Sequence, residues 1–352
     1  MISATASPAP VLSCAPALVL PGDHAAIRTV TDDDRSLLVA PGGTVAEVVA
    51  GQLTPLGYAV SRPEGPLHAS LRGDVVAVVE SDGLRCRNAT TGVALWRRTG
   101  MIEEVAFTLD ASLLWAVERV APEHIRLLCL ATADGAVVAE QDMMDPFFGS
   151  TTRLVAPRVT STPDSEQMVL ELGGGQDGIG SWLLTRVNGD VASTELFPRQ
   201  ERVVTAWSPS GRRALAWDNT EQRYLACDWA GVSPEVTAVG DDDTFDAHEG
   251  VGYWETFLTE DLALVQSGDD RLWAFVVDSL RLGPELELDG FPPFPSRRIF
   301  GGSSEALMAP FKTVRRCGGQ LVLTTWAPLG TEPTTVVVAV ATVRKAIAEQ
   351  GA

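Results

Sequence analysis

The sequence predicts an all-β protein built by repeating one unit of four short strands. Short runs rich in Val, Leu, Ala and Trp recur between turns of Asp, Gly, Asn and Pro, and almost no segment has sustained helical periodicity. The runs fall into groups of four, which recur at intervals of roughly 36 to 52 residues. These observations predict a single β-propeller of about seven four-stranded blades.

The clearest unit spans residues 22–51. It contains an acidic turn at Asp32–Asp34, a Gly-Gly turn and three predicted strands: Ala25–Val30, Ser36–Ala40 and Thr44–Val49. Residues 203–229 repeat this order, with Ser-Pro-Ser-Gly as the first turn.

The innermost strands of the seven blades are predicted to begin near Ala26, Leu67, Glu103, Val155, Val203, Tyr253 and Ile299. One four-stranded sheet cannot bury both faces alone, so radial stacking of the blades has to supply the core. Residues 1–352 are therefore one domain. Within the N-terminal segment 1–20, Val11–Leu20 is a candidate ring-closing strand beside Thr334–Val343, and residues 344–352 are predicted to be a C-terminal tail.

Two kinds of repeat carry a family resemblance. GDHAAI, TVTDDDRSLLVA and GGTVAEVV, together with AWSPSGRRALAWD, resemble the WD repeat, whereas NATTGVALWRRTG at 88–100 resembles a quinoprotein repeat. The chain is thus similar to WD-repeat or quinoprotein-like propellers with degenerate repeats. The terminal Trp-Asp dipeptide is missing, however, and Cys227-Asp228-Trp229 inverts it. The resemblance implies a protein-interaction role, and a structural role for His24 in tying its loop to a turn.

The chain is strongly acidic. Asp and Glu number 46 against 27 Lys and Arg, which gives a net charge of −19. Phosphate backbones and anionic lipids are repelled by such a surface, so no nucleic-acid or membrane partner is predicted. A protein partner, easiest to accommodate if basic, and a small molecule both remain open. In the alternative interpretation, the charge only keeps a large β surface soluble.

The cysteines and the N-terminus predict a cytoplasmic protein. Five cysteines, an odd number without CxxC spacing, suggest reduced and packed thiols rather than disulfides or a zinc site. The first twenty residues lack the positively charged start of a secretory signal, and no run of about 18 apolar residues predicts a membrane span.

The upper face of the propeller is the predicted working surface. In four-stranded blades, the loop entering the inner strand and the loop between strands two and three lie on this face, and loops vary while sheets hold position. All four histidines fall there: His24, His68, His124 and His248. His68 and His248 are candidates for ligand contact, acid–base work or metal binding, but no metal site is predicted, because loop membership brings no set of three ligands together.

The entry to the sixth blade contains the richest local mixture of side chains. Asp246, His248 and Glu249 precede Tyr253 and Trp254 within nine residues, and aromatic planes beside carboxylates suit a cationic or aromatic ligand, or a basic peptide. Alternatively, the two aromatic residues pack between blades. Arginines at other blade entries could clamp a carboxylate or pair with a partner. The candidate binding set is His68, Glu103, Arg153, Arg202, Asp246, His248, Tyr253, Trp254 and Arg298.

The leading hypothesis is a non-catalytic interaction or scaffold propeller that binds a partner through its upper face, because no nucleophile, base and orienting residue form a set. The alternative is a propeller-type lyase, cyclase or lactonase, for which His68, His248, Glu249 and Tyr253 would supply acid–base groups. No cofactor is predicted, because the Gly-rich segment at 172–182 lacks the pattern of a nucleotide-binding loop.

Overall fold

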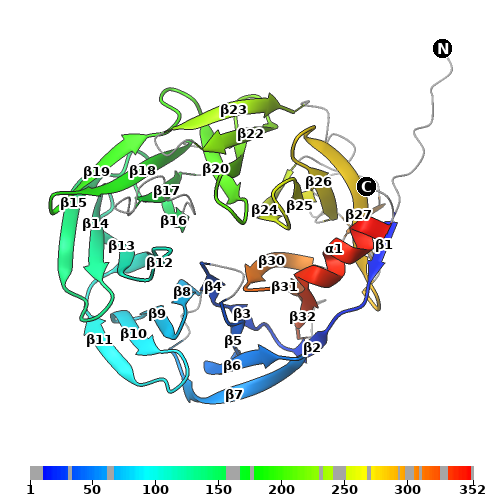
Figure 1. The fold of residues 1–352 in the computed structure, drawn as a ribbon, viewed down its shortest axis with the longest axis horizontal. Helices are drawn as coiled ribbons and strands as arrows, with labels where there is room; N and C mark the ends of the chain where they lie inside the picture. The colour runs from blue at the N-terminus through cyan, green and yellow to red at the C-terminus, as the bar shows by residue number, and fades with distance from the viewer. Residues whose placement is uncertain are drawn as a thin grey trace.

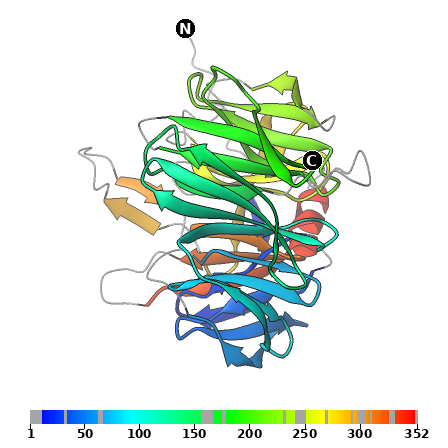
Figure 2. The ribbon, with the colours of Figure 1, turned by 90° about the vertical axis from the view of Figure 1, so that its left-hand side faces the viewer.

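The structure is a computed structural model in which short antiparallel sheets surround a central axis (Figure 1). The predicted all-β class and the propeller-like arrangement are confirmed. Figure 2 shows that the hairpin β28 (Phe294–Arg297) and β29 (Glu305–Met308) projects from the face opposite helix α1 (Val340–Glu349). The residues described are 11–30, 34–61, 67–155, 167–174, 178–229, 233–240, 251–267, 271–291, 294–297, 305–308, 311–325 and 332–349.

Two sheets form the N-terminal part of the ring. The first contains, from the axis outward, β3 (Ala25–Ala26), β5 (Leu37–Val39), β6 (Thr44–Val49) and β7 (Gln52–Ala59). The second contains β8 (Ala69–Arg72), β9 (Val75–Glu80), β10 (Gly83–Asn88) and β11 (Ala94–Arg98). Strand β4 (Arg28–Thr29) runs parallel to β8 at the inner edge of the second sheet, so the chain joins both sheets at the axis.

The largest sheet consists of two antiparallel halves. One half contains β12 (Ile102–Phe107), β13 (Leu113–Ala121), β14 (His124–Ala131) and β15 (Val137–Met144). The other contains β16 (Thr151–Val155), β17 (Gln167–Gly173), β18 (Ile179–Val187) and β19 (Asp190–Glu195). The halves meet through the parallel pairing of Glu140 on β15 with Asp190 on β19.

Three further groups of strands complete the ring. The first is β20 (Arg202–Trp207), β21 (Arg213–Asp218), β22 (Arg223–Trp229) and β23 (Pro234–Val239). The second is β24 (Val251–Phe257), β25 (Leu262–Ser267), β26 (Leu272–Val276) and β27 (Arg281–Leu288). The third is β30 (Phe311–Cys317), β31 (Gln320–Thr325) and β32 (Thr334–Ala339).

The N-terminal strands join the two ends of the chain. Strand β2 (Leu18–Pro21) pairs antiparallel with β32, and β1 (Val11–Cys14) pairs in parallel with β27 of the preceding sheet. One short segment therefore covers the outer edges of two neighbouring sheets. These pairings remove exposed edge strands where the first and last residues of the ring meet.

Hydrophobic clusters between neighbouring sheets form the core. Phe107 and Leu114 from the β12–β15 half pack against Leu84 and Cys86 of the second sheet, and all four side chains are fully buried. All five cysteines of the chain are free and buried, as expected for packed thiols. Burial raises the pKa of the Cys86 thiol to about 12, which makes it inert at neutral pH.

The sheets do not correspond one to one with seven four-stranded blades. Within the described residues, six sheets have four or more strands, because β12–β15 and β16–β19 belong to one eight-stranded sheet. The chain end also differs from its prediction. The strand expected to reach Val343 stops at Ala339, and helix α1 replaces the tail, because Val340, Val343 and Ile347 share one buried helical face.

Candidate functional site

The innermost strands enclose a cavity of about 420 Å³ in the central channel. Strands β4, β8, β12, β16, β20, β24 and β30 all contribute residues to its wall. Successive side chains of a strand point to opposite sides, so residues two apart, such as Glu104 and Ala106 on β12, both line the cavity. The charged residues of the wall are Arg28, His68, Glu104, Arg153, Glu255, Arg315 and Arg316.

Glu104 is the centre of one charged group in this wall. Arg28 Nη2 donates to Glu104 Oε1 at 2.8 Å, and His68 Nδ1 lies 3.1 Å from Glu104 Oε2. The backbone N–H of Val105 also donates to Glu104 Oε1, at 2.9 Å. Burial opposes ionisation of Glu104, but Arg28 and His68 outweigh it and hold the pKa of this carboxyl below its ordinary value. Glu104 is therefore a carboxylate at neutral pH.

In a second charged group of the wall, around Arg153, the carboxyl pKa values are raised rather than lowered. Arg153 Nη1 lies 3.4 Å from Glu171 Oε2, and Arg153 Nη2 donates to the Thr205 carbonyl at 3.3 Å. Burial raises the pKa of Glu171 to about 7, with Arg153 opposing the shift and Glu255 adding to it. Burial also raises the pKa of Glu255, whose Oε1 accepts a 2.7 Å hydrogen bond from the Tyr224 hydroxyl.

The cations face the cavity more than the anions do. The side chains of Arg28 and Arg153 are 35% and 44% exposed, whereas those of Glu104 and Glu171 are 7% and 10% exposed. A third arginine, Arg315, is close enough that burial and the positive charges of Arg28 and Arg153 lower its pKa. The arginines thus give this part of the wall a positive surface inside a chain of net charge −19.

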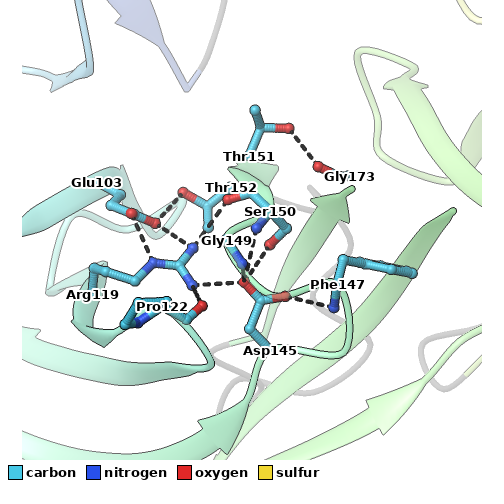
Figure 3. Close-up of polar contacts among 10 residues, drawn as sticks. All are labelled: Glu103, Arg119, Pro122, Asp145, Phe147, Gly149, Ser150, Thr151, Thr152 and Gly173. Atoms are coloured by element: carbon cyan, nitrogen blue, oxygen red, sulfur yellow. Dashed lines mark hydrogen bonds and ion pairs between the residues drawn. The ribbon is translucent and has the colours of Figure 1, made fainter. Parts of the chain in front are cut away.

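The upper face, on which the innermost strands begin, carries a third polar cluster at β12–β15. Figure 3 shows Arg119 surrounded by oxygen atoms. Its guanidinium donates to both oxygens of Glu103 at 2.9 Å, to Asp145 Oδ2 at 2.6 Å and to the carbonyls of Pro122 and Ser150. The side chain of Arg119 is only 7% exposed, and every one of its nitrogens has a partner.

Asp145 holds the turn between β15 and β16 (Figure 3). Its carboxylate accepts hydrogen bonds from the backbone N–H groups of Phe147, Gly149 and Ser150 and from the Ser150 hydroxyl. Burial opposes ionisation, but these donors and Arg119 lower the pKa of Asp145 to about 2. The same turn keeps Phe148 at a φ of 53°, a left-handed conformation that a bulky side chain rarely adopts.

Four apolar side chains around this cluster are exposed. Phe148 is 74% exposed, Met101 is 70%, Met144 is 55% and Val120 is 53%. Each is tied to the cluster: Val120 follows Arg119, Met144 precedes Asp145, and the Arg119 backbone N–H donates to the Met101 carbonyl. We call Met101, Val120, Met144 and Phe148 the apolar rim. They share the upper face because β12 and β14 begin, and β13 and β15 end, at the same edge of the sheet.

The predicted candidate residues with described side chains lie in three different surroundings. His68 and Arg153 line the channel, whereas Glu103 pairs with Arg119 at the rim. Arg202 Nε donates to Asp218 at 2.7 Å within its own sheet. Asp246, His248, Glu249 and Arg298 lie outside the described residues. Tyr253 and Trp254 belong to strand β24, of which only the backbone is described at these positions.

The remaining predicted residues have local roles. His24 is buried, its backbone N–H donates to Thr335 Oγ1 at 2.8 Å, and its Nδ1 lies 3.4 Å from the Gly22 carbonyl oxygen. Asp34, at the end of the predicted acidic turn, is buried and accepts a hydrogen bond from Arg72 at 2.9 Å.

Several functional candidates were missed. Nothing in the sequence distinguishes Arg28 from an ordinary strand residue. Glu171, by contrast, could have been found, because it interrupts the apolar run MVLELG, and a carboxylate at such a position indicates burial. Adjacent aromatic residues in the turn DPFFGS are a comparable signal for Phe148.

Two classes of site are not found among the residues that the structure describes. No group of three or more His, Cys, Asp or Glu side chains there could hold a metal ion. No helix in the same part of the chain is long and apolar enough to cross a membrane.

Comparisons with known proteins identify the fold. No protein-family model matches the sequence, and no curated protein matches it. Among solved structures, U3-55K is similar over 91% of this chain and 98% of its own, with a TM-score of 0.55 and 14% identity. The RRP9 WD40 repeats are similar over 91% and 96%, with a TM-score of 0.53 and 14% identity. At such low identity the likeness concerns the fold alone, and the chain has the β-propeller fold of WD-repeat proteins.

Proposed function

We propose that this chain is a non-catalytic propeller that holds a protein partner through its upper face. The observation that carries the proposal is the apolar rim, in which four side chains are each more than half exposed. Scattered surface hydrophobic residues are ordinary, but a group of them on one face favours a protein-binding site.

The support beneath the rim strengthens this proposal. Arg119 and Asp145 have several hydrogen bonds each and tie together the segments that present Met101, Val120, Met144 and Phe148. Loops that are already ordered lose little conformational entropy when a partner binds. In addition, Phe148 keeps a costly backbone conformation while its ring stays exposed, a combination that favours a role in contact.

Charge around the rim favours a basic partner. Glu140 is exposed on β15, Glu123 is half-buried on the β13–β14 connection, and the chain as a whole is acidic. Complementary charge at the border of an apolar contact accelerates association and selects partners. The expected partner therefore inserts apolar side chains between basic ones.

The finer architecture belongs to the same proposal. We infer seven blades, because each half of the eight-stranded sheet has the four consecutive antiparallel strands of one blade, and the halves share only the pairing of Glu140 with Asp190. A cytoplasmic location is supported by the five cysteines, which are all free and buried.

The enzyme alternative has weaker support. Of its four proposed acid–base residues, only His68 has a described side chain, and that imidazole is hydrogen-bonded to Glu104. This contact orients a wall residue of the channel but does not favour catalysis over binding.

A photo-crosslinking experiment tests the rim. A photoreactive phenylalanine analogue at position 148 should capture a protein partner in cells, whereas the same analogue at Val93 should not. Val93 is 63% exposed and lies between β10 and β11, on the opposite face, so it is a matched control.

The captured protein should then be purified and its affinity measured by calorimetry. We expect Phe148→Ala and Met101→Ala each to weaken binding by roughly tenfold, since truncating a buried interface anchor costs more than about 1 kcal/mol. Val93→Ala should leave the affinity unchanged. Equal crosslinking at both positions, or unchanged affinity in both rim variants, would refute the proposal.

A further inference from the structure

The channel cavity is separate from the apolar rim and has a different chemistry. We propose that it binds the carboxylate or phosphate group of a small anionic molecule through Arg153, with Arg28 and Arg315 adding positive charge. The three arginines come from β16, β4 and β30, so the fold brings them to the axis from distant parts of the chain.

The accessible surface of this site is cationic although its formal charges are mixed. The side chains of Arg28 and Arg153 are several times more exposed than those of Glu104 and Glu171. A ligand that enters the cavity therefore meets positive groups first, with their counter-charges behind them. The low-dielectric walls of a channel strengthen such a local field, even in an acidic protein.

Arg153 is the residue best able to exchange its partners. Its contacts with Glu171 and the Thr205 carbonyl measure 3.4 and 3.3 Å, which is the long limit of a hydrogen bond. In Arg119, by contrast, the contacts with the two carboxylates measure 2.6 to 2.9 Å. Replacing the long contacts of Arg153 with a bidentate ligand costs little and gains two short charge-assisted bonds.

Glu171 couples the binding of an anion at Arg153 to the uptake of a proton. Its Oε1 is buried and has no hydrogen-bond partner within the described residues, and its pKa of about 7 allows it to take up a proton at neutral pH. When an anion takes Arg153, Glu171 loses its stabilising charge and should become protonated. Binding should therefore be tighter at low pH than at high pH.

Several other groups face this pair and have to be considered in the pH dependence. Arg28 on β4, Glu104 on β12 and Glu255 on β24 all act on the charge of Glu171. His68, beside β8, faces Glu104. Separate variants of Glu171 and His68 are needed to assign the effect.

The size of the cavity sets the class of ligand. A volume of about 420 Å³ lies in the usual range of small-molecule pockets. The planar guanidinium fork matches both planar carboxylates and tetrahedral phosphates. These two sources share the chemistry that the arginines recognise, and the choice between them is an experimental one.

Calorimetric titration of the full chain tests the site. Oxalate serves as the carboxylate probe and sulfate as the tetrahedral probe for phosphate, since neither changes its charge between pH 6 and 8. We expect at least one to bind, with Arg153→Gln weakening it tenfold or more and Arg153→Lys weakening it less. Arg97→Gln is the matched control, because Arg97 pairs with Asp82 at the outer surface. The tighter probe identifies the ligand group.

The same titration at two pH values tests the role of Glu171. Wild type should bind several-fold more tightly at pH 6 than at pH 8, Glu171→Gln should remove most of that difference, and His68→Gln should retain it. The site is disproved if neither anion binds at millimolar concentration, or if folded Arg153→Gln and Arg153→Lys both bind like wild type. The proton link is disproved if Glu171→Gln keeps the pH dependence.

Discussion

Asp145, beneath the apolar rim, and Glu171, beside the channel, are both buried carboxyl groups next to an arginine. Their pKa values shift in opposite directions. Asp145 accepts hydrogen bonds from four donors in its own turn as well as from Arg119, and its pKa falls to about 2. Glu171 has one long contact with Arg153, and its pKa rises to about 7. Burial raises both pKa values, but the donors of Asp145 outweigh it, whereas Glu171 has only Arg153 close by and is also repelled by Glu255 and Glu104. The Arg119–Asp145 pair, in which every donor and acceptor has a partner, is suited to supporting a surface. The Arg153–Glu171 pair, which has few partners, is available for a ligand.

The largest expected effect is the loss of stability when the saturated pair is broken. Arg119→Met should lower the free energy of unfolding by about 3 to 5 kcal/mol, because Asp145 and Glu103 both lose the guanidinium that neutralises their charges. Arg153→Met should cost less than about 1 kcal/mol, since its contacts are long and its side chain is 44% exposed. Urea unfolding at pH 7 measures both. Similar losses of stability in the two variants would contradict the proposed difference between the two arginine–carboxylate pairs.

The next effect is the pH dependence of stability at the channel. The pKa of Glu171 in the folded state, about 7, is above its ordinary value of 4.5, so the folded protein binds the proton more tightly than the unfolded chain. This contribution is fully present below pH 4.5 and is lost as pH rises through 7. Glu171→Gln should therefore raise stability at pH 8 by about 3 kcal/mol and by much less at pH 5. Thermal unfolding at the two pH values measures this difference.

If Glu171→Gln shifted stability equally at both pH values, the charge on Glu171 would not be the cause. Asp145 provides the opposite reference. Its lowered pKa gives stability that is present above pH 3.8 and lost as pH falls through about 2. Acid unfolding below pH 4 should therefore respond to Asp145→Asn and not to Glu171→Gln.

The ring was predictable from sequence because its repeat is local. The unit at 22–51 alternates apolar runs with Asp and Gly turns, and these turns fix strand order without long-range information. Helix α1 was missed because its first residues, Val340–Val343, continue an apolar strand without a break. The two halves of the largest sheet are joined by one pairing, that of Glu140 with Asp190, and no local sequence pattern reveals this pairing.

The site was predictable only in part, because it is assembled from inner strands that are far apart in sequence. His68 and Arg153 were singled out at blade entries, and both line the channel. Their partners Glu104 and Glu171 act through burial, which a sequence pattern suggests for Glu171 but does not pair with Arg153. Arg28 reaches Glu104 from another sheet, a contact between residues 76 apart.

The smallest expected effect concerns the strain at Phe148, which distinguishes a rim that is merely exposed from one kept for contact. At a φ of 53°, glycine is free of the penalty that a side chain has, so Phe148→Gly should be about 1 kcal/mol more stable than Phe148→Ala and at least as stable as wild type. Both variants should bind the crosslinked partner equally weakly, because both lack the exposed ring. Chemical unfolding and calorimetry on the same two proteins provide the comparison. A Phe148→Gly protein less stable than wild type would mean that the ring packs within the fold, and the rim would then lose its main contact residue.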